Sequence, residues 1–275
     1  MHYLDQDFPV NHPELPLLID QLSLWSAPFG KWLLDNVPMQ RDLDVLDVGC
    51  GTGFPLIELA QQLGTSAKLT GIDSWVEGIN RAIWKVEKMG LKNVELVRGD
   101  AAKMPFKDGQ FDLVVSNLGI NNFDNPPAVL KECHRVLKRN GKICITTNIE
   151  GHFREFYMVF ESVLKESNLK DSLPLLKADI EHRGNNETIR DLFEQAGFSV
   201  LKMLRERSQL RYLDGSAMMH HFLTVVGFLP AWRAIIPKEK EREVFGLLEK
   251  KLNEQADWDG ELKMTVPMLF VEAVK

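Results

Sequence analysis

The chain has 275 residues, a formal net charge of −6 and 44% hydrophobic residues, which suits one elaborated α/β domain with a sizeable core. The acidic balance lacks the basic surface of a nucleic-acid-binding protein, so we expect no nucleic-acid partner. The three cysteines are widely spaced, which argues against a disulfide framework or a zinc site. The first residues lack the pattern of a signal peptide, and no apolar run reaches the roughly 18 residues of a membrane span. We therefore expect a reduced, cytoplasmic protein without bound metal.

Residues 1–40 carry an apolar stripe at helical spacing. Its members are Leu18, Leu22, Trp25, Phe29 and Trp32. Pro28 lies inside the stripe, and because proline disrupts a helix interior we predict two short helices with a kink near Ser26. The stripe fits a lid over a ligand pocket and a helix docked on the edge of a sheet equally well.

Residues 45–53 are the most informative part of the chain. An apolar run that contains Asp47 leads into Gly49-Cys50-Gly51-Thr52-Gly53, and a helical pattern follows. A strand that feeds a glycine-rich turn and a helix start is typical of a site for a nucleotide-like ligand. Phe54 stands where a dinucleotide site has its third glycine, and no Gly-Lys-Ser/Thr follows. Asp47 suits a cationic ligand better than a pyrophosphate.

Alternating strand and helix patterns follow this turn. Further strands are predicted over Lys68–Asp73, Val94–Val97, Phe111–Asn117 and Gly141–Thr147. The alternation predicts a parallel, doubly wound sheet. Asp47, Asp73 and Asp100 each lie at the carboxyl end of a strand, the edge where such sheets bind ligands. An acid at the end of the second strand is placed to bind both hydroxyls of a ribose.

The run Leu46-Asp47-Val48-Gly49-Cys50-Gly51-Thr52-Gly53, with the acids that follow it, resembles the motifs of class I S-adenosylmethionine (AdoMet)-dependent methyltransferases over roughly Asp44 to Thr147. Residues 98–106, Arg-Gly-Asp-Ala-Ala-Lys-Met-Pro-Phe, look most like the ubiquinone/menaquinone-biosynthesis type, which acts on small molecules. The resemblance implies a Rossmann-like α/β sheet of seven strands, the last one antiparallel, and S-adenosyl-L-methionine as cofactor. It also implies that Asp100 accepts a hydrogen bond from the adenine amino group. The residues expected to bind AdoMet are Asp47, Gly49, Cys50, Gly51, Gly53, Asp73, Ser74, Trp75, Asp100, Ala101 and Asn117.

The chain is expected to comprise an N-terminal helical lid, residues 1–40, and an AdoMet-binding core, residues 41–150. Residues 151–205 complete the core and include a helical insert, with a strand from Phe198 to Leu204. A helical insertion occupies residues 206–262, and residues 263–275 hold the final strand. Insertions of this length on a rigid scaffold usually serve as lids or binding surfaces.

The 206–262 insertion contains two helical patterns. The pattern from Ser216 to Leu229 is apolar almost all round, which fits a buried helix, the wall of an apolar substrate pocket or a homodimer contact. Burial is the commonest outcome for such a helix. The second pattern is amphipathic, with a stripe of Val244, Leu248 and Leu252.

The methyl acceptor has candidate residues in two places. The ends of strands four and five nominate Asn117, Leu118 and Asn148. The insertion offers an apolar wall with polar groups: Tyr212, Met218, His221 and Phe222. His220 and His221 point about 100° apart on a helix, so they do not readily share a metal. His221 is a candidate base, against the commoner case of a histidine satisfied by packing.

The run Asp124-Asn125-Pro126-Pro127 partly matches the Asn-Pro-Pro-aromatic motif of amino methylation. It lies beyond strand four, and Ala128 stands where the aromatic residue belongs, so we reject that interpretation. The prolines instead indicate the first turn of a helix, with Asp124 or Asn125 as its cap.

These observations predict an AdoMet-dependent methyltransferase that acts on a small, apolar or aromatic molecule by in-line transfer. The chemistry requires chiefly positioning and exclusion of water, and we expect Asn117 and His221 to serve it and the insertion to close over the acceptor. The alternatives are a non-catalytic AdoMet-binding or dimerising protein, and an RNA or protein methyltransferase, which the acidic charge disfavours. The sequence leaves open the acceptor, the methylated atom, the need for a base and the oligomeric state.

Overall fold

The computed structural model describes residues 2–20 and 23–275. The chain forms two compact units. The core unit consists of Val10–Asn148, Asn185–Arg205 and Met268–Lys275, and the helical unit consists of Met1–Pro9, Ile149–Gly184 and Glu206–Pro267. Leu22, a member of the predicted N-terminal stripe, lies outside the described residues.

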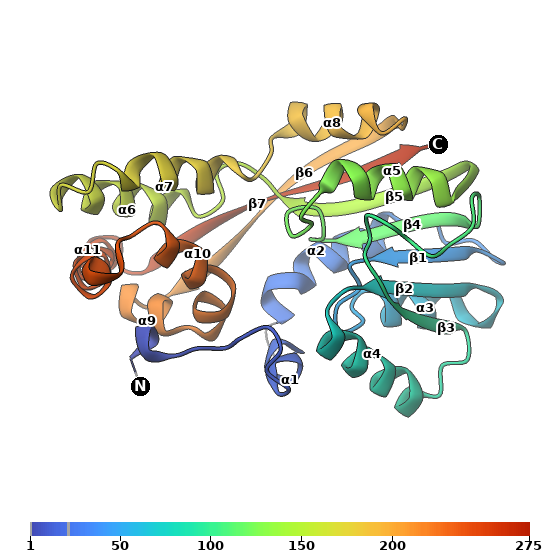
Figure 1. The fold of residues 1–275 in the computed structure, drawn as a ribbon, viewed down its shortest axis with the longest axis horizontal. Coiled ribbons are helices and arrows are strands. Elements are labelled where there is room, and N and C mark those ends of the chain that lie inside the picture. The colour runs from blue at the N-terminus through green and yellow to red at the C-terminus, as the bar shows by residue number, and fades with distance from the viewer. Residues whose placement is uncertain (1, 21–22) are drawn as a thin grey trace. The chain divides into compact units, whose positions relative to one another are not determined.

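In the described part of the chain, seven strands form one sheet in the order β3-β2-β1-β4-β5-β7-β6 (Figure 1). They are β1 Asp44–Val48, β2 Lys68–Asp73, β3 Val94–Arg98, β4 Phe111–Asn117, β5 Leu137–Asn148, β6 Ser199–Tyr212 and β7 Leu262–Val274. Strands β1 to β5 pair in parallel, and β7 runs antiparallel to β5. The predicted Rossmann-like sheet with an antiparallel last strand is confirmed.

Helices follow the strands as the sequence patterns indicate. The core unit contains α1 Leu15–Asp20, α2 Ser23–Asn36, α3 Leu56–Leu63, α4 Val76–Met89, α5 Pro126–Val136 and α8 Asn186–Gln195. The helical unit contains α6 Arg154–Glu166, α7 Ser172–Glu181, α9 Gly215–His220, α10 Leu229–Ala234 and α11 Glu241–Asp259, with a π-helix over Thr224–Phe228. No described helix is long and apolar enough to cross a membrane.

The register of the parallel strands determines where their ends meet. Val48 pairs with Ile72 in β2, and Asp73 pairs with Arg98 in β3. The carboxyl ends of β1, β2 and β3 therefore lie along one edge of the sheet. The β1 residues Val45 and Val48 are fully buried, as expected for a parallel strand with both faces covered.

Two predicted helix boundaries are confirmed by their caps. Gly90 ends α4 in the left-handed conformation, at φ 67°, and its N–H donates to the carbonyls of Val86 and Glu87. The side chain of Asn125 accepts a hydrogen bond from the Ala128 amide at the start of α5. The Asp124–Pro127 run is thus a helix start.

The predicted break at Pro28 is wrong, because α2 continues through this residue. A proline lacks the N–H that would bond the carbonyl four residues earlier, which here belongs to Leu24. Leu24 is 78% exposed, so this part of the helix lies at the surface.

The predicted helix from Ser216 to Leu229 is also interrupted. His221 has an extended backbone, with φ −64° and ψ 131°, and separates α9 from the π-helix. Its Nδ1 accepts a hydrogen bond from the Leu223 amide at 3.2 Å. A side chain that bonds a nearby backbone N–H competes with the helical hydrogen-bond pattern, which accounts for the break.

Strand β6 is longer than predicted, because it continues past Leu204 to Tyr212. The added residues are mostly charged or polar and show no clear apolar alternation. Strand β6 lies at the edge of the sheet, where charged side chains are tolerated and discourage pairing with other chains.

Candidate functional site

The glycine turn after β1 has a backbone that only glycine adopts readily. Gly49, Gly51 and Gly53 have φ angles of 77°, 50° and 99°. A Cβ at Gly49 would lie 3.3 Å from the ring of Phe123, so this position also needs a residue without a side chain. The turn is thus a close-fitting cradle at the carboxyl edge of the sheet.

Asp47 is a buried carboxyl group whose oxygens lack hydrogen bonds of normal geometry with the described residues. It is 0% exposed. Burial, and then the nearby charge of Asp73, raise its pKa to about 8, while the Leu56 amide at the start of α3 acts to lower it. A buried acid of this kind favours a cationic ligand nearby, because a positive charge would stabilise its ionised form.

Asp73 ends β2 with its carboxylate held in one orientation. Its Oδ2 accepts a hydrogen bond from the Gly51 amide, and its Oδ1 accepts one from the Trp75 amide, each at 2.8 Å. Each oxygen retains a further acceptor site, so the carboxylate can receive two hydroxyl groups at once.

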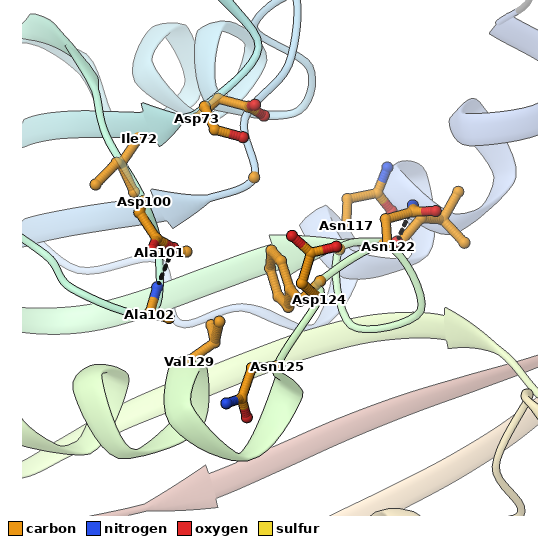
Figure 2. A pocket seen from close by; sticks show the side chains of 15 residues that line it. Ile72, Asp73, Asp100, Ala101, Ala102, Asn117, Asn122, Asp124, Asn125 and Val129 are labelled. Carbon is orange, nitrogen blue, oxygen red and sulfur yellow. Dashed lines mark hydrogen bonds between the residues drawn. The ribbon is translucent and has the colours of Figure 1, made fainter.

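Asp100 follows β3 and is exposed. Its Oδ1 accepts a hydrogen bond from the Ala102 amide at 2.8 Å, and this bond fixes the turn (Figure 2). Ser74 and Ala101 lie beside the two acids on the same cavity.

A cavity of about 500 Å³ joins these features, within the size range of small-molecule sites. Figure 2 shows Asp73 and Asp100 on one side and Asn117, Asn122 and Asp124 on the other. The lining residues are Gly49, Ile72, Asp73, Ser74, Asp100, Ala101, Ala102, Asn117, Leu118, Gly119, Asn122, Phe123, Asp124, Asn125 and Val129.

The cavity includes six of the residues expected to bind AdoMet. They are Gly49, Asp73, Ser74, Asp100, Ala101 and Asn117. Asp47, Cys50, Gly51, Gly53 and Trp75 do not line it. Cys50 is buried, and like the buried Cys133 and Cys144 it is a free thiol. Gly51 and Trp75 act indirectly, through the hydrogen bonds that orient Asp73.

The far wall of the cavity, residues 119–125, was missed by the sequence analysis. The run Asn121-Asn122-Phe123-Asp124-Asn125 was interpreted only through its helix cap. Its polar residues follow β4 at the edge of the sheet where ligands bind. Polar residues at that place in the chain are the signal that could have predicted this wall.

The acceptor candidates of the core unit form a hydrogen-bonded group. Asn117 accepts a bond from Thr146 Oγ1 at 2.7 Å and donates from Nδ2 to the Ser26 carbonyl at 3.3 Å. Asn148 is buried, and its carbonyl and its Oδ1 both accept from Asn121 Nδ2 at 2.8 Å. Asn117 is therefore a fixed amide on the cavity wall.

The remaining candidates belong to the helical unit. The rings of Tyr212 and His221 meet edge to face, with centroids 5.4 Å apart. Met218 is fully buried, and Phe222 packs on Phe8 at 4.9 Å. Burial lowers the pKa of His221.

The site combines a glycine cradle, two carboxylates at strand ends and a buried acid suited to a cation. Among the described residues, no group of three or more His, Cys, Asp or Glu side chains is placed to hold a metal ion. On a seven-stranded sheet of this order, such a site defines an AdoMet-dependent methyltransferase, because AdoMet is a nucleoside with a cationic tail.

Comparisons with known proteins agree with this class. A family model described as a methyltransferase domain matches residues 40–197. A demethylmenaquinone methyltransferase of Listeria welshimeri is 32% identical over 206 residues, which are 70% of this chain and 84% of the relative. One of Lactococcus lactis is 30% identical over 214 residues, 74% of this chain and 80% of the relative. The crystal structure of a SAM dependent methyltransferase from Aquifex aeolicus is 25% identical, covers 70% of this chain and 92% of that chain, and has a TM-score of 0.55.

The chain therefore belongs to the class I AdoMet-dependent methyltransferase family, and within it to the menaquinone-biosynthesis type. It is an enzyme that methylates a small molecule with AdoMet as cofactor. The non-catalytic alternative is not favoured.

Proposed function

We propose that the enzyme methylates a ring carbon of a demethylated quinone in its reduced, hydroquinone form. The observation that carries this proposal is the 30–32% identity to demethylmenaquinone methyltransferases over at least 80% of their length. The hydroquinone form of such a quinone is aromatic and largely apolar, which agrees with the acceptor class expected from the sequence.

The cofactor assignment supports the proposal. The residues present fit AdoMet, because the Gly49 cradle excludes a Cβ and the buried Asp47 carboxyl group calls for a cation. Asp73 would bind the ribose hydroxyls with the two acceptor sites left free by its backbone hydrogen bonds. Asp100 would accept from the adenine amino group. When bound, AdoMet supplies an electrophilic methyl group on a sulfonium.

Transfer to a ring carbon needs little acid–base chemistry from the protein. The ring carbon would form a bond to the methyl group, the carbon–sulfur bond would break with its electron pair on the sulfur, and the ring would then lose the proton of that carbon to solvent. The hydroquinone oxygens push electrons toward the ring carbon, most strongly when one of them is ionised. The protein must align donor and acceptor and exclude water.

Asn117 and His221 remain the proposed catalytic residues, with roles refined by their contacts. The amide of Asn117 is held at both ends, so it would orient the acceptor and would not move a proton. His221 Nδ1 accepts from the Leu223 amide, so the neutral imidazole carries its proton on Nε2. His221 in this tautomer would donate a hydrogen bond to a ring oxygen and stabilise negative charge there. The cytoplasmic location and a homodimer remain part of the proposal.

The test uses the full chain, AdoMet with a deuterated methyl group, and a reduced demethylated naphthoquinone with a short isoprenoid tail. We expect S-adenosylhomocysteine and a product labelled on a ring carbon, as measured by mass spectrometry. His221→Gln should lower the rate, and His220→Gln is the matched control, because His220 bonds the Ser216 carbonyl on its own helix and packs edge to face on the Tyr3 ring. Turnover with amines or simple alcohols but not with the hydroquinone would overturn the proposed acceptor.

A further inference from the structure

Residues 10–20 of the core unit form a strap that is tied at both ends. At one end the carbonyl of Val10 accepts a hydrogen bond from Trp75 Nε1 at 2.9 Å. Gly78 allows the indole to lie against α4, because a Cβ there would be 2.3 Å from the ring. At the other end the strap finishes in α1, whose last residue is Asp20.

Asp20 bonds three side chains from two elements. Its Oδ1 accepts from Thr52 Oγ1 at 2.8 Å and from Lys85 Nζ at 3.0 Å, and its Oδ2 accepts from Arg81 Nε at 2.7 Å. The Asp20 side chain is 17% exposed. Burial alone would raise its pKa, but the hydrogen bonds from Arg81, Thr52 and Lys85 outweigh burial and lower it.

The bond to Thr52 extends this cluster into the glycine turn. Both ion pairs of Asp20 run to α4, whereas its bond to Thr52 reaches the glycine turn. Thr52 lies between Gly51 and Gly53, whose positive φ angles and missing side chains allow several backbone conformations, although the Gly53 amide bonds the Cys50 carbonyl at 2.8 Å. No heavy atom lies within 4 Å of an ideal Cβ at Gly51, so side-chain packing does not hold that part of the turn.

The strap is tied to one of the two residues that hold the Asp73 carboxylate and to the neighbour of the other. One of the two amides that hold this carboxylate belongs to Trp75, whose indole bonds the strap at Val10. The other belongs to Gly51, the neighbour of Thr52, whose hydroxyl bonds Asp20. The contacts therefore run from the strap to the carboxylate by two separate routes.

We propose that Asp20 is a positioning residue for cofactor binding, which acts through Thr52 on the glycine turn and the Asp73 carboxylate. It touches no cofactor atom in this role. The inference rests on the proposed ribose role of Asp73 and is independent of the methyl acceptor. Without the Asp20–Thr52 hydrogen bond the glycine turn can adopt other backbone conformations. Cofactor binding must then order the turn, and this lowers the affinity.

The test is a double-mutant cycle on the full chain, with S-adenosylhomocysteine affinity measured by calorimetry. Thr52→Val replaces the hydroxyl with a methyl group and should weaken binding about fivefold, the value of one ordinary hydrogen bond. Thr52→Ser should restore it. Asp20→Ala should weaken binding at least as much, and adding Thr52→Val to it should cause no further loss. Asp35→Ala, which removes an exposed pair with Lys31 in α2, is the control.

A positioning role and a purely structural role predict different results. If Asp20 and Thr52 position the turn for the cofactor, Thr52→Val should raise the KM for AdoMet and leave kcat at saturating AdoMet and the melting temperature unchanged. A purely structural role would instead lower the melting temperature. Wild-type affinity in Thr52→Val, or independent losses from the two substitutions, would overturn the inference. If Asp20→Ala does not fold, the Thr52→Val and Thr52→Ser pair still decides the matter. Unchanged affinity in Asp73→Ala would instead refute the ribose assignment.

Discussion

The buried carboxyl group of Asp47 should make the stability of the ligand-free enzyme fall as the pH rises. Its pKa is raised to about 8 in the folded chain, against about 3.9 in an unfolded one. Between these values the folded state holds one more proton than the unfolded state, so the free energy of unfolding falls by about 1.4 kcal/mol per pH unit. The contribution of protonated Asp47 to the free energy of unfolding is full below about pH 4 and is lost by about pH 8.

Asp47→Asn removes this titration and keeps the shape of the side chain. Between pH 5 and pH 7 the wild type should lose up to about 3 kcal/mol relative to the variant, the limit for a fully buried group. Urea unfolding of both proteins measures the difference. The unfolding transition that shifts when S-adenosylhomocysteine is added belongs to the core unit, so its free energy is the one compared. Equal pH dependence in the two proteins would refute the reasoning.

The same group gives a signature of cofactor binding. If the cationic end of AdoMet favours the ionised form of Asp47, binding at pH 7 should release up to about 0.9 proton, because a group of pKa 8 is about 90% protonated there. Calorimetry in two buffers of different ionisation enthalpy measures this release. Asp47→Asn should release none, and a wild type without proton release would contradict the assignment of the cation to Asp47.

Four further outcomes are expected. Asp73→Ala should weaken AdoMet binding by about 1–3 kcal/mol, because ribose hydroxyls and the backbone amides that hold the carboxylate lose their acceptor; unchanged affinity in calorimetry would exclude the ribose role. Gly49→Ala should lower cofactor affinity and cost about 1 kcal/mol or more in stability, because φ is 77° and the Cβ would meet Phe123. Gly246→Ala in α11, with open space around its Cβ, should instead stabilise by about 0.5–1 kcal/mol in the same unfolding assay. Activity should survive exhaustive chelation, and a loss restored by zinc or magnesium would show that a metal takes part.

The elements that the sequence predicted well are those with local signals. Strand β4 has its predicted bounds, Phe111–Asn117, and α4 ends at Gly90, because apolar runs and a capping glycine act over a few residues. The three strand-end acids were found because a parallel register brings such ends to one edge.

The features that were missed depend on contacts far apart in the chain or on competition between local bonds. Asp20 contacts Thr52, Arg81 and Lys85, which are 32, 61 and 65 residues away, and no local pattern marks it. Phe123 gains its place on the cavity wall by packing on Gly49. The break at His221 comes from one side-chain bond to the backbone, which apolar periodicity does not reveal.

The strand order has a consequence for how the protein is made. Strand β7 lies between β5 and β6, although it is the last strand along the chain, and Lys142 in β5 pairs with Val274. During synthesis β6 has no neighbour in the sheet until the ribosome has added β7. The buried residues Leu269, Phe270 and Val271 reach β5 only at the end of translation. Until then the growing chain carries an open strand edge, and a message cut short before these codons would yield a protein that keeps its glycine turn but exposes that edge to aggregation.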